Sequence, residues 1–160
     1  MRGLLAAVAA ALLLAPVASA HTDSPKQIPF AWPAQGILTT SFGVQPDGRF
    51  HPGIDIGVLA SLAIWAAAPG IVVAVGEPPQ FDGYGNVVLV DLGGGVQALY
   101  AHLSSWSVEV GDVVAEGEPI GVAGCTGWCT GTHLHFELRS GGEAFDPLPL
   151  LPLQAVTATG

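Results

Sequence analysis

Four of the five histidines lie beside glycines or in strand-like segments, and they are the residues best suited to chemistry. His51 and Asp55 flank a Pro-Gly turn in the segment His-Pro-Gly-Ile-Asp. One imidazole nitrogen and one carboxylate oxygen at this spacing are donors that suit zinc. Taken alone, the same pair is also typical of a local hydrogen bond. The segment therefore indicates a metal ligand pair only if other donors join it.

A second pair of histidines occurs in the segment Thr-His-Leu-His-Phe-Glu. Residues two apart on a strand point to the same face, so His133 and His135 are expected to face one space. Leu134 and Phe136 are then expected to face the core. The alternative for this segment is a polar strand face that carries two solvated histidines.

His102 ends the apolar segment Leu-Tyr-Ala-His-Leu, where strand alternation predicts that it shares a face with Tyr100. A half-buried histidine without a special role is the alternative. Together the three segments favour a catalytic zinc site, in which three protein ligands leave one position for water. Two further histidines could carry the proton and stabilise the oxyanion. The spacing alone does not choose between His133 and His135 as the ligand.

Short apolar runs, broken by glycine and proline, must position these residues. Their lengths predict strands in one mainly antiparallel, all-β domain. The predicted strands cover 36–42, 54–58, 71–75, 87–92, 96–103, 113–115, 120–123 and 133–138. The run 58–68 could form a helix, but it lacks a polar face and ends at Pro69-Gly70, which favours a buried strand with a flanking turn.

The first twenty residues have the pattern of a secretory signal peptide. Arg2 precedes an apolar run, and Ala18-Ser19-Ala20 is a small-residue cleavage site. The run is shorter than the roughly 20 residues of a membrane span, so we expect a secreted protein without stable membrane insertion after cleavage. We also expect the protein to be a monomer. A retained segment would act as a tether. The expected organisation is a signal peptide at 1–20, an extended lead-in at 21–35, one domain at 36–149 and a loose tail at 150–160.

The charge balance argues against two classes of partner. The formal net charge is -9, with 4 Lys and Arg against 13 Asp and Glu. Nucleic acid and anionic membranes both require clustered cations, so neither is an expected partner. The segment 110–121 resembles the hammerhead of biotinyl and lipoyl carriers, but the only lysine, Lys26, lies in the lead-in. A carrier function is therefore excluded.

The two cysteines, Cys125 and Cys129, are four positions apart with Gly127 between them. In an exported chain they are expected to form a disulfide, because the compartment is oxidising and Gly127 permits a turn. The competing interpretation makes them zinc ligands. That arrangement would close the metal site and remove the position for water.

From about Ser41 to Pro147 the chain resembles the lysostaphin and LytM family of zinc endopeptidases. Four ordered segments carry the resemblance: 51–55, the Gly-Tyr-Gly-Asn segment with its strand at 83–91, 99–104 and 126–137. The family's duplicated hybrid motif fold implies an antiparallel sheet that forms an open, barrel-like groove, with walls at 76–85 and 124–131. Peptidoglycan stems or cross-bridges are the implied substrates. The implied roles are zinc ligands for His51, Asp55 and His135, and a catalytic pair for His102 and His133.

The sequence departs from the family pattern without losing any of those five residues. Leu92 and Thr132 replace a frequent histidine and a frequent proline, and the cysteines bracket a loop that is usually polar. Some members use a tyrosine before the first motif to help the oxyanion, and none occurs between Gly36 and His51. Non-catalytic relatives lose ligands and activate other wall hydrolases. A zinc-binding, non-hydrolytic wall-binding or amidase-activating protein is therefore the alternative function.

Overall fold

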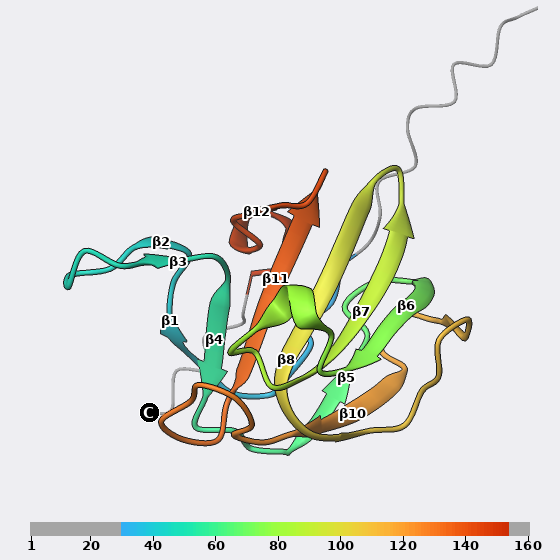
Figure 1. Ribbon diagram of the computed structural model, residues 1–160, viewed down its shortest axis with the longest axis horizontal. Helices are drawn as coiled ribbons and strands as arrows, with labels where there is room; N and C mark the ends of the chain where they lie inside the picture. Colours follow the sequence, from blue (N-terminus) through green and yellow to red (C-terminus); the bar gives the residue numbers. More distant parts are fainter. Residues whose placement is uncertain (1–29, 154–160) are drawn as a thin grey trace, which may run out of the picture.

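The computed structural model describes residues 30–153 and consists of antiparallel β-strands with two single-turn 3-10 helices (Figure 1). The main sheet has ten strands, of which seven follow one path. In spatial order these are β1 (Ile37–Thr40), β4 (Ile54–Gly57), β11 (Leu134–Ser140), β8 (Val96–Trp106), β7 (Asn86–Gly93), β6 (Gly70–Gly76) and β9 (Val113–Val114). The expected all-β, open antiparallel fold is confirmed.

The remaining elements extend or cover this sheet. Strand β10 (Pro119–Ala123) pairs with both β8 and β5 (Ala63–Trp65), and β12 (Glu143–Phe145) forms a hairpin with β11. A separate small hairpin joins β2 (Gly43–Val44) to β3 (Phe50–His51). The 3-10 helices are η1 (Pro79–Phe81) and η2 (Leu148–Leu150).

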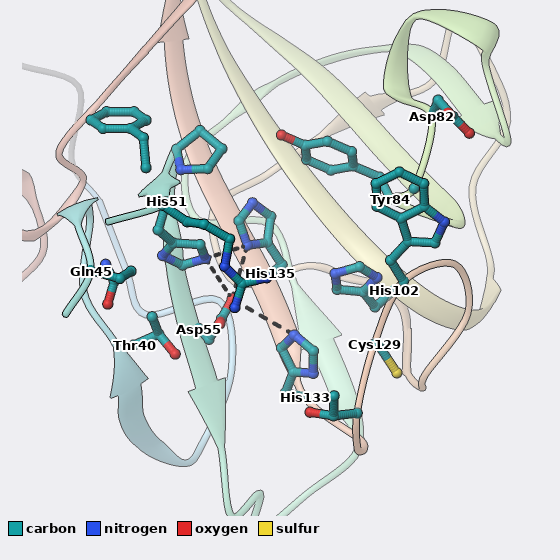
Figure 2. A pocket seen from close by; sticks show the side chains of 16 residues that line it. Thr40, Gln45, His51, Asp55, Asp82, Tyr84, His102, Cys129, His133 and His135 are labelled. Atoms are coloured by element: carbon teal, nitrogen blue, oxygen red, sulfur yellow. Dashed lines mark hydrogen bonds and ion pairs between the residues drawn. The ribbon is translucent and has the colours of Figure 1, made fainter. Parts of the chain in front are cut away.

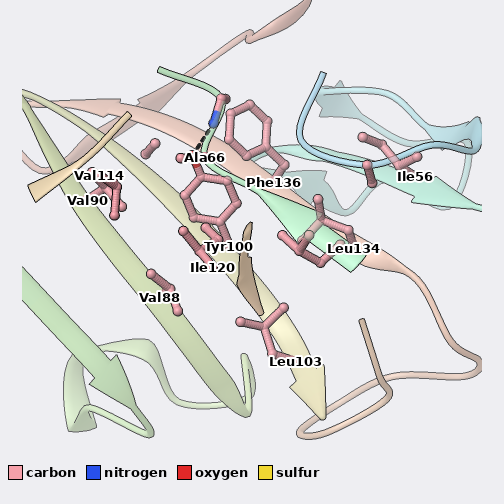
Figure 3. Packing of buried hydrophobic residues seen from close by; sticks show 14 of the residues in the cluster. Ile56, Ala66, Val88, Val90, Tyr100, Leu103, Val114, Ile120, Leu134 and Phe136 are labelled. Carbon is pink, nitrogen blue, oxygen red and sulfur yellow. Dashed lines mark hydrogen bonds between the residues drawn. The ribbon is translucent and has the colours of Figure 1, made fainter. Parts of the chain in front are cut away.

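Strand alternation gives the sheet two distinct faces. On β11, Leu134 and Phe136 are fully buried in the main core, as predicted, and His135 and Glu137 point to the opposite face. Tyr100 of β8 packs against Phe136 at 5.3 Å between ring centroids (Figure 3). Its hydroxyl accepts a hydrogen bond from the Ala67 backbone N–H at 2.8 Å. The core therefore fixes β8 and β11 from one side and leaves their other side for polar residues.

The segment 58–68 differs from the expected buried strand. Only Ala63–Trp65 form a strand, and Val58 is 73% exposed, whereas Ala66 is fully buried. The amide of Trp65 bonds to the carbonyl of Pro33 rather than to a strand partner on that side. The run is therefore mostly a loop that closes the core, and its apolar residues divide between core and surface.

Some described residues that flank the sheet on either side contribute to the core. Residues 30–35 form no strand, yet Ala34 is buried. Leu151 is also buried, and the Trp32 indole donates a hydrogen bond to the Pro152 carbonyl at 2.8 Å. The predicted signal peptide, His21 and Lys26 lie outside the described residues. Within 30–153, no helix is long and apolar enough to cross a membrane.

Candidate functional site

Three donor atoms converge on the sheet face opposite the main core (Figure 2). Asp55 on β4 and His135 on β11 are direct partners in the register, and the Asp55 Oδ1 lies 2.9 Å from His135 Nδ1. His51, at the end of β3, places its Nε2 3.1 Å from Asp55 Oδ1 and 3.0 Å from His135 Nδ1. These residues form a group that could hold a metal ion.

In His51 and His135, the ring nitrogen that points away from the group lies within hydrogen-bond distance of an acceptor. His51 Nδ1 lies 3.0 Å from the Ser41 carbonyl oxygen, and His135 Nε2 lies 3.0 Å from Glu137 Oε1. A carbonyl or a carboxylate can only accept, so these nitrogens carry the proton of the neutral imidazole. The inner nitrogens then present lone pairs to the Asp55 carboxylate. Lone pairs and a carboxylate this close together require a cation between them.

The pKa shifts of Asp55 and His135 both favour the charged form of the group. Burial favours the neutral acid of Asp55, but the adjacent His135 and His51 rings outweigh burial and hold the pKa of this carboxyl far below its usual range. Burial also favours neutral His135, but hydrogen bonds with Asp55 and Glu137 raise the pKa of this imidazole. The carboxylate of Asp55 and the raised pKa of His135 both favour positive charge at this point of the site.

The donor set fits zinc. Zinc is bound by histidine and carboxylate at about 2.0–2.2 Å, which spaces tetrahedral ligand atoms about 3.3 Å apart. The three observed separations, 2.9 to 3.1 Å, are close to that spacing. Gly53 makes this packing possible, because a Cβ there would lie 2.4 Å from the Phe136 carbonyl oxygen and 3.0 Å from Cε1 of His135. Any larger residue at position 53 would clash with the β11 backbone next to His135.

His102 and His133 form a second pair beside this group. Their ring centroids are 4.8 Å apart, and His133 Nε2 lies 3.7 Å from Asp55 Oδ1. Their Nδ1 atoms lie 2.8 Å from the backbone carbonyls of Thr126 and Gly131 respectively, so each carries its proton there. Both Nε2 atoms are then available as proton acceptors. The structure thus brings all five sequence-predicted residues to one place.

The expectation that His102 shares a face with Tyr100 is wrong. Tyr100 lies in the main core, whereas His102 lines the site. Residues 100 and 103 of β8 pair with 88 and 86 of β7, so β8 has one residue more than its partner between these pairs. His102 absorbs that extra residue with a φ of +60°, which turns its side chain to the site face. Positive φ is costly outside glycine and often accompanies function.

Burial also sets the protonation state of His102. Burial is the largest effect and lowers the pKa of this imidazole. The hydrogen bond to Thr126 opposes the shift, and repulsion from His133 and His135 adds to it. His102 therefore favours the neutral form, which can accept a proton at Nε2.

Glu137 and Tyr84 were not assigned a role from the sequence. Glu137 is fully buried, and its Oε1 also accepts a hydrogen bond from the Tyr84 hydroxyl at 2.6 Å. Arg139 pairs with the other carboxylate oxygen. The Tyr84 ring packs edge-on against His135 at 5.3 Å. The alternation that placed His133 and His135 on one face also places Glu137 there, and this was the available signal.

A cavity of about 470 Å³ surrounds these residues. Its walls come from the β2–β3 hairpin, the loop around Asp82 and Gly83, and the loop that carries Trp128. Cys125 and Cys129 form a disulfide across the last loop, with their Cα atoms 5.5 Å apart. The site is thus a walled recess in an otherwise open sheet.

Comparison with known proteins identifies the family. The model of peptidase family M23 matches residues 49–147, a span that includes every residue of the donor group and of the second histidine pair. The chain belongs to peptidase family M23. The predicted resemblance to the lysostaphin and LytM family is confirmed by this match and by the structural likeness to lysostaphin.

Individual M23 relatives carry two kinds of name. The chain is 38% identical over 130 residues to the DD-carboxypeptidase/endopeptidase Mpg of Neisseria meningitidis, covering 81% of this chain and 28% of Mpg. It is 36% identical over 121 residues to the murein hydrolase activator NlpD of Escherichia coli, covering 76% and 31%. The catalytic domain of lysostaphin from Staphylococcus simulans has a TM-score of 0.58 at 32% identity, covering 71% and 88%. The chain thus spans less than a third of either curated relative.

Proposed function

We propose that this M23 protein is an exported, zinc-dependent endopeptidase that hydrolyses peptide bonds in peptidoglycan stems or cross-bridges. His51 Nε2, an Asp55 oxygen and His135 Nδ1 would hold the zinc ion. The observation that carries the proposal is the inward convergence of these three donors beside a second histidine pair with both Nε2 atoms available.

The residues divide the chemistry between them. A zinc ion held here would supply Lewis-acid polarisation of the scissile carbonyl and activation of a water molecule. Neutral His102 would accept a proton at Nε2 and return it to the leaving amine. His133, 4.8 Å away between ring centroids, would share this transfer or stabilise the charge that develops on the carbonyl oxygen. The Thr126 and Gly131 carbonyls hold both rings in the required tautomer.

The substrate class rests on the shape of the recess and on the names of the relatives. The recess is open to solvent along the sheet face, and loops with many glycines form part of its walls. An extended peptide with few bulky side chains fits such a channel. Mpg is named a DD-carboxypeptidase/endopeptidase and NlpD a murein hydrolase activator, which supports a peptidoglycan substrate and an extracytoplasmic place of action.

The second candidate is a zinc-binding activator of other wall hydrolases, and the similarity to NlpD favours it. The two candidates differ in whether this chain itself cuts. Purified peptidoglycan is incubated with the zinc-loaded protein, with and without chelator, and the released fragments are identified by mass. Chelator-sensitive release of new peptide ends supports the peptidase. Absence of fragments, together with stimulation of a separate amidase, would replace it with the activator.

Metal analysis of single alanine variants tests the ligand assignment. Zinc content should fall below stoichiometric in the variants of His51, Asp55 and His135, and should persist in His102→Ala. Circular dichroism of each variant checks that the fold remains. A folded His135→Ala protein that retains one equivalent of zinc would contradict the assignment.

A further inference from the structure

A second cavity of about 410 Å³ adjoins the zinc-site recess, and the proposed mechanism does not use it. Asp82, Gly83 and Trp128 line both cavities and form the wall between them. In Figure 2, Asp82 lies on the Tyr84 side of the donor group and Gln45 lies on the opposite side. The recess therefore continues past the proposed metal in one direction, over the indole of Trp128.

Trp128 is exposed and at the same time fixed in place. Its side chain is 81% exposed, but its backbone N–H donates to the Gly83 carbonyl at 2.7 Å. A Cβ on Gly83 would lie 3.0 Å from the indole, and a Cβ on Gly127 would lie 2.4 Å from the Gly83 carbonyl oxygen. Both glycines have positive φ. Two interlocked glycine turns and the neighbouring disulfide thus hold an aromatic surface out to solvent.

The chemistry of the second cavity selects for positive charge. Glu77 and Asp82 line it, and among residues 30–153 no lysine or arginine does. An indole face attracts ammonium and guanidinium groups. The recess on the other side of the donor group is lined by Arg49 instead. Arg49 is paired with Asp47 at 2.7 Å, so the difference in charge lies in the second cavity, where the two carboxylates adjoin the indole.

We propose that Trp128 and the second cavity form a subsite for a positively charged amino group of the peptide substrate, such as the side-chain amine of a diamino acid. The subsite rests on the proposed peptidase function for its biological substrate, but amine binding itself does not require hydrolysis. Glu77 and Asp82 provide the opposite charge, and the Trp128 face contacts the ammonium and the methylene chain that carries it.

The test compares two stem-type tetrapeptides that differ only in a lysine or an Nε-acetyl-lysine. Binding to the zinc-loaded His102→Ala protein is followed by the NMR signal of the Trp128 indole N–H, assigned by its loss in Trp128→Leu. We expect the lysine peptide to bind about 3- to 30-fold more tightly, which is the range for a cation over an aromatic face. Because cleavage is not measured, failure of the peptidase proposal would leave this result unaffected.

Variants then locate the preference, with peptide affinities measured by isothermal titration calorimetry because Trp128→Leu removes the NMR signal. Trp128→Leu should reduce the lysine preference to near unity, and Glu77→Gln should reduce it in part. Glu116→Gln removes one carboxylate from an exposed turn that lines neither cavity, and should leave the preference unchanged. Equal affinities for the two peptides, or no saturable shift of the Trp128 signal with either, would overturn the subsite. So would a preference that survives Trp128→Leu.

Discussion

Replacement of Glu137 is expected to weaken zinc binding although this residue is not a proposed ligand. Its Oε1 accepts the proton of His135 Nε2 at 3.0 Å and that of the Tyr84 hydroxyl at 2.6 Å, and its Oε2 accepts from Arg139. The carboxylate therefore orients the His135 ring and increases the electron density on Nδ1. Loss of such an outer carboxylate typically reduces metal affinity 10- to 100-fold.

Two substitutions separate charge from hydrogen bonding. Glu137→Gln keeps an oxygen for His135 and Tyr84 but turns an amide N–H toward Arg139, so we expect about tenfold weaker zinc binding. Glu137→Ala leaves all three donors without this acceptor. Its affinity should fall about 100-fold, equal to about 2.7 kcal/mol, and the zinc-free fold should lose about 3–5 kcal/mol, as for a broken buried ion pair.

Competition against a chromophoric chelator measures the zinc affinity, and urea unfolding of the chelator-treated protein measures stability separately. Glu143→Gln is the matched control, because Glu143 is exposed on the adjacent strand β12. Tyr84→Phe keeps the ring against His135 and should cost less than Glu137→Gln. Unchanged zinc affinity in a folded Glu137→Ala protein would refute the reasoning that the carboxylate positions the ligand.

Three further outcomes are expected. His102→Gln and His133→Gln should each retain zinc and lose about 10²- to 10⁴-fold in kcat, the usual contribution of a proton-transfer group, measured on released peptide ends. A substantial residual rate in either would contradict its catalytic role. In the zinc-free protein, an NMR titration should give a pKa for His102 below 6.5, because burial disfavours its imidazolium; a value above 6.5 would contradict the burial argument. Replacing Cys125 and Cys129 by serine should cost less than about 2 kcal/mol of unfolding free energy, because the closed loop is short, and intact mass with and without reductant reports the disulfide in the native protein.

The sequence predicted the sheet and the side-chain directions on β11 because β11 is a regular strand with a partner on each side. Alternation is reliable where both neighbours hold a strand in register, as they do around His135. The same alternation failed at His102. A single extra residue in β8 reverses the side-chain direction there, and no residue type in that segment marks its position.

Short elements were missed for a related reason. The β2–β3 hairpin has two residues per strand, too few for any hydrophobic period, although Asp47-Gly48 is a recognised turn signal. Glu137 stands in the motif at 133–137, two residues from both His135 and Arg139, but its role depends on three partners that are not all local in sequence. One of them, Tyr84, is 53 residues away. Such a network becomes visible only when the strands are assembled.

The hydrogen bond from the Tyr84 hydroxyl to Glu137 limits which groups could stabilise the oxyanion in the proposed reaction. Burial and the hydrogen bond to Glu137 raise the pKa of the Tyr84 hydroxyl above its usual value, so the hydroxyl remains a donor directed away from the recess. In the proposed mechanism, the charge on the carbonyl oxygen would then be met by a zinc ion and by the histidine pair. Each of these histidines has its Nδ1 proton on a backbone carbonyl, so only a protonated ring can donate through Nε2. If the pair both accepts a proton and donates to the oxyanion, the two histidines would divide these tasks, because a single histidine cannot serve as acceptor and donor in the same transition state.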